Sequence, residues 1–193
     1  MERVGTILFL NLLFITCLST QLMVQSAIEN PRENIDQWYQ NLPHAQQKLT
    51  MLHFYLHEVV FGPHRTLVTV ANASNTSTTP PYFGLVNIFD NPLTKGPKPG
   101  SKLVGRAQGL YGFSSQEEVS LLTAMNFVFT SGKHSGSSLT VLGRNPIEQS
   151  VRELPIIAGT GVFRLAHGFA LVKTYFLDTS GAIVEYNVTI LHY

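Results

Sequence analysis

The chain has 193 residues, of which 44% are hydrophobic and 13% are charged, and its formal net charge at pH 7 is +1. This length and this balance fit one compact domain better than two. A net charge so close to zero gives no sign of the basic surface that binds nucleic acid.

The N-terminus has the pattern of a secretory signal peptide. Arg3 precedes an apolar run from Ile7 to Leu18, and small residues follow at Ser26 and Ala27. The apolar run is too short to span a bilayer. We therefore expect residues 1–26 to be removed, and the mature protein to be extracellular and not attached to a membrane.

Cysteine and sequon positions agree with secretion. The one cysteine, Cys17, lies inside the predicted signal peptide, so the mature protein would have no disulfide and no thiol chemistry. Three Asn-x-Ser/Thr sequons, at Asn72, Asn75 and Asn187, are candidate glycosylation sites. Because sequons also occur by chance, they support secretion only together with the signal peptide.

The composition changes near Leu49. Residues 27–48 are polar and interrupted by Pro31 and Pro43, which predicts a flexible N-terminal arm. From residue 49 to residue 193, short β-branched and aromatic runs alternate with Gly, Pro, Asn and Ser clusters, a texture typical of an all-β domain. The eight runs lie near residues 49–61, 82–90, 102–113, 118–130, 136–143, 151–158, 162–178 and 182–192.

The connections between these runs are mostly short, which predicts that successive strands are antiparallel neighbours. Closing eight such strands into an up-and-down β-barrel would remove the exposed sheet edges. A barrel of this size can hold one small ligand. The predicted fold is therefore all-β, an eight-stranded antiparallel up-and-down β-barrel.

Two charged residues share predicted strand faces with apolar neighbours. Glu58 alternates in phase with Phe54 and Leu56, and Arg152 alternates in phase with Leu154. Burying a charge is costly unless it is paired. Both residues therefore either reach water or a structural ion pair at the rim of the barrel, or belong to a functional site inside it.

Residues 102–113 place small and aromatic side chains on one face. Gly105, Gly109, Tyr111 and Phe113 alternate in phase, so this face could form a pocket with aromatic surface and one hydroxyl. Alternatively, the glycines could relieve strain at a tight bend or bulge. The run 162–178 is apolar on both faces, which predicts an outer layer supplied by an oligomer interface.

Other motifs do not indicate metal or nucleotide chemistry. His53 and His57 share a strand face, but no nearby Asp or Cys completes a metal site. Gly159-Thr160-Gly161 lacks the Lys and the helix of a phosphate loop and is typical of a hairpin turn. We therefore expect no metal and no cofactor.

Five segments, in this order along the chain, resemble the plant dirigent family. They are residues 53–58 (HFYLHE), 89–93 (FDNPL), 105–111 (GRAQGLY), 152–155 (RELP) and 158–168 (AGTGVFRLAHG). The resemblance implies an eight-stranded barrel of the allene oxide cyclase type that forms homotrimers in the apoplast. It also implies phenylpropanoid substrates: a separate laccase or peroxidase makes phenoxy radicals, and the barrel directs their regio- and stereoselective coupling.

The resemblance assigns site residues by position. Glu58 matches the acid of the first-strand motif, which is usually Asp in the family, and Arg152 matches the pocket arginine; both are candidate catalytic residues. Tyr111 matches the pocket tyrosine, and Phe113 lies where lignan-forming members often have a second tyrosine. The candidate substrate-binding residues are Tyr111, Phe113, Asn145, Phe54 and Gln108.

Asn145 lies where lignan-forming members have a second acid, within Gly143-Arg144-Asn145-Pro146. An amide forms hydrogen bonds but does not act as an acid. This pattern resembles a broad group that includes pterocarpan synthases, which dehydrate an isoflavanol through a quinone methide. Three alternatives follow: a guide of radical coupling, a stand-alone dehydratase (a carbon–oxygen lyase), or a barrel that binds a hydrophobic ligand without chemistry.

Overall fold

The computed structural model describes residues 31–72 and 79–193, which excludes the predicted signal peptide and Asn75. The structure divides the chain between Ala45 and Gln46 into two units. The first contains the α-helix α2 (Pro31–Asn41) and the 3-10 helix η1 (Leu42–His44) where a flexible arm was expected. Proline is tolerated in the first turn of a helix, because its missing N–H would have no partner there. Over the described residues, no helix is long and apolar enough to cross a membrane.

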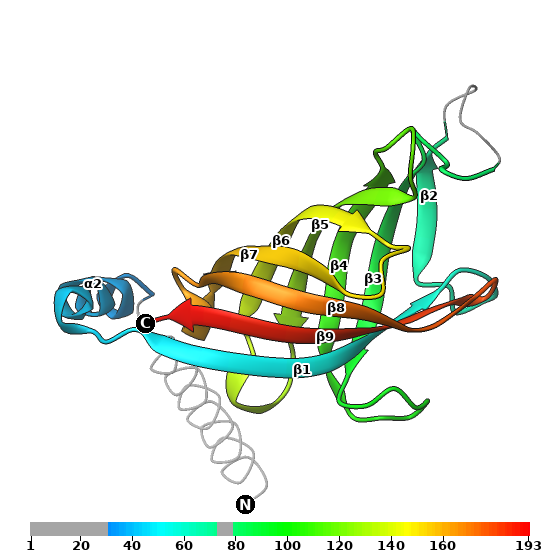
Figure 1. Cartoon of the computed structure of the whole chain (residues 1–193). Coiled ribbons are helices and arrows are strands. Elements are labelled where there is room, and N and C mark those ends of the chain that lie inside the picture. Colours follow the sequence, from blue (N-terminus) through cyan, green and yellow to red (C-terminus); the bar gives the residue numbers. More distant parts are fainter. Residues whose placement is uncertain (1–30, 73–78) are drawn as a thin grey trace, which may run out of the picture. The chain divides into compact units, whose positions relative to one another are not determined.

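The second unit is a β-barrel in which, apart from the first two, strands that follow one another in sequence are neighbours in space (Figure 1). Every pairing is antiparallel. The strands are β1 (Lys48–Val59), β2 (Leu67–Ala71), β3 (Val86–Thr94), β4 (Leu103–Phe113), β5 (Ser120–Phe129), β6 (Ser138–Pro146), β7 (Arg152–Thr160), β8 (His167–Asp178) and β9 (Gly181–His192).

The ring closes between its first and third strands. β1 pairs along its whole length with β9, and its C-terminal half also pairs with the end of β3, Tyr55 with Thr94 and Leu56 with Leu93. Eight strands therefore form the closed barrel, as predicted. The short β2 pairs only with β3 and lies outside this ring. It was not expected, since four of its five residues are exposed and give no alternation.

β3 continues past the point where the sequence predicts its end. The expected run stopped at Asp90, before Asn91 and Pro92, whereas the strand extends to Thr94. Asp90 donates its backbone N–H to Thr66, on the side of β3 that faces β1 and β2. Pro92 lies two residues after Asp90, so the position of its missing N–H is on that same side of β3. No ladder hydrogen bond is lost there, because Pro92 lies in the gap between the residues that pair with β2 and those that pair with β1.

One end of the barrel is filled by aromatic side chains. The ring of Phe54 lies 4.9 Å from that of Phe127 and stacks on Tyr186 at 5.9 Å. Phe163, which the sequence predicts in a strand, lies instead in the 3-10 helix η3 (Gly161–Phe163), where it is fully buried in the same core. The positive φ of Gly161, 62°, begins this turn. The remaining space lies at the other end, between the C-terminal half of β1 and the start of β9.

The two inward-facing glycines of β4 allow close contact with β5. A Cβ atom on Gly105 would lie 2.2 Å from the carbonyl oxygen of Val128, and one on Gly109 would lie 2.2 Å from that of Ala124. Neither glycine lines the internal space. Their function is therefore strand packing, the second of the two alternatives drawn from the sequence.

The Gly105→Ala variant should be less stable than the parent protein by about 1–3 kcal/mol, because the added methyl group overlaps backbone atoms that are fixed by the β4–β5 pairing. Gly112→Ala is the matched control on the same strand, since its Cβ would be 3.5 Å from the nearest atom. Chemical denaturation of the three proteins measures the difference. Equal stability of the two variants would contradict the packing role.

Candidate functional site

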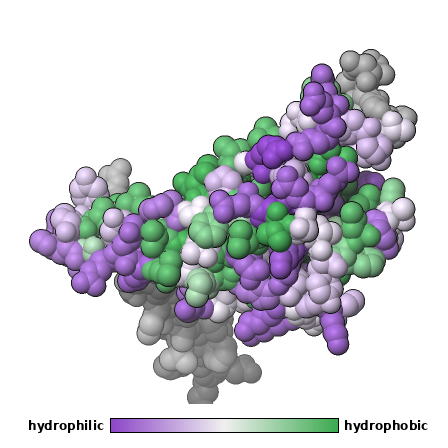
Figure 2. All heavy atoms as spheres, viewed as in Figure 1, coloured by the Kyte–Doolittle hydropathy of each residue, from purple (hydrophilic) through white to green (hydrophobic). Residues whose placement is uncertain are grey.

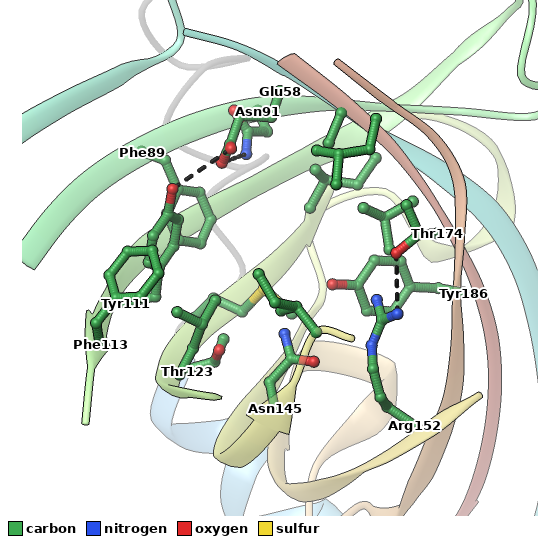
Figure 3. A pocket seen from close by; sticks show the side chains of 17 residues that line it. Glu58, Phe89, Asn91, Tyr111, Phe113, Thr123, Asn145, Arg152, Thr174 and Tyr186 are labelled. Atoms are coloured by element: carbon green, nitrogen blue, oxygen red, sulfur yellow. Dashed lines mark hydrogen bonds between the residues drawn. The ribbon is translucent and has the colours of Figure 1, made fainter. Parts of the chain in front are cut away.

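The unfilled end of the barrel holds a cavity of about 130 Å³. A buried water needs roughly 10–15 Å³ on this measure, so the cavity has room for about ten water-sized groups, the size of one small aromatic molecule. Its wall is mostly apolar. Eight polar side chains interrupt that wall: Glu58, Asn91, Tyr111, Thr123, Asn145, Arg152, Thr174 and Tyr186. Figure 3 shows Glu58, Asn91 and Tyr111 on one side and Arg152 on the other.

Glu58 is the acid of the first side. The Tyr111 hydroxyl lies 3.4 Å from its Oε1 atom, and the amide nitrogen of Asn91 lies 3.4 Å from its Oε2 atom. Burial raises the pKa of the Glu58 carboxyl, and these two hydrogen bonds only partly oppose that effect. Glu58 therefore keeps a proton at a higher pH than an exposed glutamate does.

Asn91 is held in one orientation by Thr66. The Thr66 hydroxyl accepts a hydrogen bond from the Val59 N–H at 3.0 Å and donates one to the Asn91 Oδ1 at 2.5 Å. The NH₂ group of Asn91, a residue that is 1% exposed, must then face Glu58. Because NH₂ only donates, the proton of neutral Glu58 is directed to Oε1, beside Tyr111.

Arg152 is the cation of the opposite side. It is 3% exposed, and its Nη1 donates to the carbonyl oxygen of Gln149 at 3.2 Å and to the Thr174 hydroxyl at 2.9 Å. Burial lowers the pKa of its guanidinium, which nevertheless stays charged at physiological pH. No ion pair among the described residues includes Arg152.

Several buried polar atoms at the cavity have no hydrogen-bond partner. They include the Arg152 Nε, the Thr123 Oγ1 and the Asn145 Oδ1. Tyr186, at the base of the same wall, has its pKa raised by burial and keeps its proton. A ligand in this cavity would therefore meet free donors and one adaptable amide near the arginine.

Five of the predicted site residues line this cavity: Glu58, Tyr111, Phe113, Asn145 and Arg152. Their catalytic and binding roles remain predictions. Two others are placed elsewhere, which corrects the sequence-based assignment. Phe54 lies deeper, packed in the aromatic core. Gln108 lies exposed on the outside of the barrel, because even-numbered residues of β4 point outward.

Sequence reasoning did not identify Asn91, Thr123, Thr174 and Tyr186 as cavity residues. A signal existed for Asn91, which alternates in phase with Phe89 inside the motif at residues 89–93. The same signal existed for Thr174, which alternates in phase with the buried Ala170 and Val172. Leu177 has no such signal, because β8 contains a register irregularity between Thr174 and Phe176, after which an odd-numbered side chain lines the cavity.

The other candidate sites lie on the surface or have local partners. His53 contacts Glu185 at 2.8 Å, and the His57 Nε2 lies 2.7 Å from the Thr94 hydroxyl. Throughout residues 31–72 and 79–193, no three His, Cys, Asp or Glu side chains form a group that could hold a metal ion. The sequon residues Asn72 and Asn187 are both exposed.

The Thr66→Val variant should raise the pKa of Glu58 further, because a valine cannot orient the Asn91 amide and the ionised carboxylate loses a donor. Thr66→Ser keeps the hydroxyl and should leave that pKa unchanged. Thr140→Val is the remote control, since it breaks a similar 2.8 Å bond to Asn126 on the outer face. Carbon NMR titration of the Glu58 carboxyl measures the shift, and identical titration curves for all variants would refute the orienting role.

Comparisons with known proteins agree with the geometry. The family model described as "Dirigent-like protein" matches residues 49–191. Dirigent protein 1 of Arabidopsis thaliana is 51% identical over 146 residues, covering 76% of this chain and 80% of the relative. Pterocarpan synthase 1 of Glycyrrhiza echinata is 47% identical over 151 residues, 77% of this chain and 80% of that relative. A solved structure of a pterocarpan synthase dirigent protein is 46% identical and superimposes with a TM-score of 0.73, covering 77% of this chain and 87% of that one.

Proposed function

The chain belongs to the dirigent family, and we propose that it is a secreted protein that directs the stereoselective coupling of phenoxy radicals in its barrel cavity. A separate laccase or peroxidase would make the radicals from phenylpropanoid phenols. The observation that carries the proposal is the arrangement of Glu58 and Arg152 on opposite sides of one apolar cavity.

The protein's first contribution is orientation. An apolar cavity the size of one small aromatic molecule restricts which ring face and which carbon of a bound radical remain open to a partner. Phe89 and Tyr111 lie side by side, with ring centres 5.7 Å apart, and offer a stacking surface. Selectivity then follows from the position of the bound ring.

The second contribution is a proton. Coupling yields a quinone methide, whose carbonyl oxygen becomes more negative as a nucleophile attacks the distal carbon. A proton donor beside that oxygen lowers the barrier. Glu58, with its pKa raised by burial, carries such a proton on the oxygen next to Tyr111. We assign Glu58 as the proton donor of this step.

A second candidate function is dehydration of an isoflavanol, a carbon–oxygen lyase reaction. Asn145 replaces the second acid of lignan-forming members, and two relatives at 46–47% identity are pterocarpan synthases. Glu58 would protonate the hydroxyl that leaves as water, while the substrate phenol gives up its own proton to form the quinone methide. Internal attack by a second phenol would close the ring. Binding of a hydrophobic ligand without chemistry is the third alternative.

The Glu58→Gln variant should lose most of its product selectivity and keep nearly the same affinity for phenols, because the amide retains the side chain's size but cannot donate a proton. Chiral chromatography of coniferyl alcohol products, made with an added oxidase, measures this. Glu153→Gln, an exposed acid on the outer face of β7, is the matched control.

Assays of the purified parent protein with and without the oxidase, and with an isoflavanol alone, distinguish the three candidate functions. Enantiomeric excess that requires the oxidase supports the coupling guide, and conversion of an isoflavanol alone supports the dehydratase. Neither reaction, with phenol binding retained, supports the ligand-binding barrel. Unchanged product ratios in Glu58→Gln would remove that residue from the mechanism.

We also propose that the protein forms a homotrimer through the outer face of β8, where the sequence is apolar on both faces. Phe169 and Leu171 lie exposed on that face, which displays scattered hydrophobic residues in Figure 2. The register pairs Leu171 with Asn187. A glycan on Asn187 would therefore cover the interface, whereas Asn72, the other described sequon, is compatible with assembly in the apoplast.

The Leu171→Lys variant should shift the oligomer to monomer, because a charge replaces an apolar contact in the interface. Leu110→Lys on β4 is the matched control, since Leu171 is 39% exposed and Leu110 is 40% exposed. Size-exclusion chromatography with light scattering gives the mass of each species. A trimer of unchanged stability in Leu171→Lys would place the interface elsewhere.

A further inference from the structure

We propose that the cavity binds its phenol as the phenolate anion, with the oxygen held beside Arg152 and Asn145. This inference rests on the proposed function, because it takes the ligand to be a phenol. It goes further by assigning the ionisation state of the phenol that binds first and the place of its oxygen. The carbonyl oxygen that Glu58 would protonate after coupling belongs to the other ring.

The first argument is the charge of Arg152. Among the described residues, its hydrogen-bond partners are neutral oxygens, those of Gln149 and Thr174. A buried charge without a counter-ion is destabilising, and replacing such groups with apolar residues is often neutral or stabilising. Glu58, the acid of the cavity, lies on the opposite side and interacts with Asn91 and Tyr111. The missing negative charge therefore has to come from the ligand.

The second argument is the set of unpartnered atoms beside that charge. The Arg152 Nε–H is a donor without an acceptor, and the residue is 3% exposed. Asn145 is also buried, and its amide can turn to present its NH₂ group. One anionic oxygen accepts several hydrogen bonds, so a phenolate oxygen would satisfy donors that the protein leaves free. A neutral phenol would instead bring a proton toward a cation.

The titratable groups that face Arg152 determine how anion binding in the cavity depends on pH. They are Glu58 of β1, Tyr111 of β4 and Tyr186 of β9, whereas β3, β5, β6 and β8 contribute no titratable side chain to the cavity. Burial raises the pKa of both tyrosines, so they stay neutral. The pKa of Glu58 is also raised, so Glu58 is neutral below that value and becomes negative as the pH rises through it. Anion binding is therefore strongest while Glu58 is protonated.

The test is a spectroscopic titration of 4-nitrophenol, whose ionised form absorbs at a longer wavelength than the neutral form. Bound to the purified protein, the probe should have a pKa at least about one unit below its value in buffer, a tenfold preference for the anion. Repeating the titration with Glu58→Gln removes the charge of that carboxyl from the measurement, and the shift should persist.

Arg152→Met should abolish the shift, and Arg144→Met, which removes an exposed arginine paired with Glu118 on the outer face, should leave it unchanged. The unfolding temperature of ligand-free Arg152→Met should be equal to or above that of the parent, because a buried unpaired charge is removed. Failure of Arg152→Met to fold would contradict the inference that the charge of Arg152 is unpaired and destabilising. Arg152→Lys, which keeps a positive charge, should retain part of the shift.

The remaining outcomes separate this inference from the function on which it rests. A bound probe with an unchanged or raised pKa, in a preparation that still couples coniferyl alcohol selectively, overturns the inference alone. Tenfold tighter binding of 4-nitrobenzoate than of 4-nitrophenol overturns it too, by assigning the site to carboxylates. Absence of both probe binding and selectivity overturns the proposed function.

Discussion

The pairing of β1 with β3 is the constraint on which the cavity depends. It joins two segments about forty residues apart in the chain at only two residue pairs, Tyr55 with Thr94 and Leu56 with Leu93. This contact closes the ring and brings the end of β1 beside the middle of β3, so that Glu58 lies next to Asn91. Thr66, in the connection between β1 and β2, bonds to both strands through Val59 and Asn91. The acid is thus positioned by the same contacts that complete the barrel.

A second constraint is the separation of charge across the cavity. The acid has two neutral donors and a raised pKa, and the guanidinium has two neutral acceptors. If they were in contact, the two groups would form a buried ion pair and neither would be available to a ligand. Because they are apart, burial favours the neutral form of the acid, and the cation has no ion-pair partner among the described residues.

Alternation along single strands is enough to predict a large part of this arrangement. Glu58 and Arg152 share faces with aliphatic neighbours, and Tyr111 and Phe113 alternate with outward-facing residues, so their inward placement follows from a period of two. Gln108 was assigned from its motif and not from its phase, and it lies outside. Leu177 is beyond such reasoning, because its place in the cavity wall follows an irregularity in the β8–β9 register. The contact between Glu58 and Asn91 is also beyond it, because it depends on ring closure.

The short elements of the fold also show which features can be predicted from the sequence and which cannot. The helix at residues 31–41 and the strand at 67–71 are short and polar or exposed, so hydrophobic periodicity gives no signal for them. The placement of Phe163 in a 3-10 turn depends on the positive φ of a single glycine. Patterns that reflect a buried face are readable from sequence, and features that depend on one turn or one distant contact are not.

Phe163, fully buried in the packed core, has a consequence for how a ligand enters the barrel. Because that end of the barrel is packed, a ligand would reach the cavity from the opposite end, beside the β8–β9 hairpin, where Leu177 is 66% exposed. A radical bound in the cavity would then meet its coupling partner from that direction, which limits the relative orientations in which the two can join.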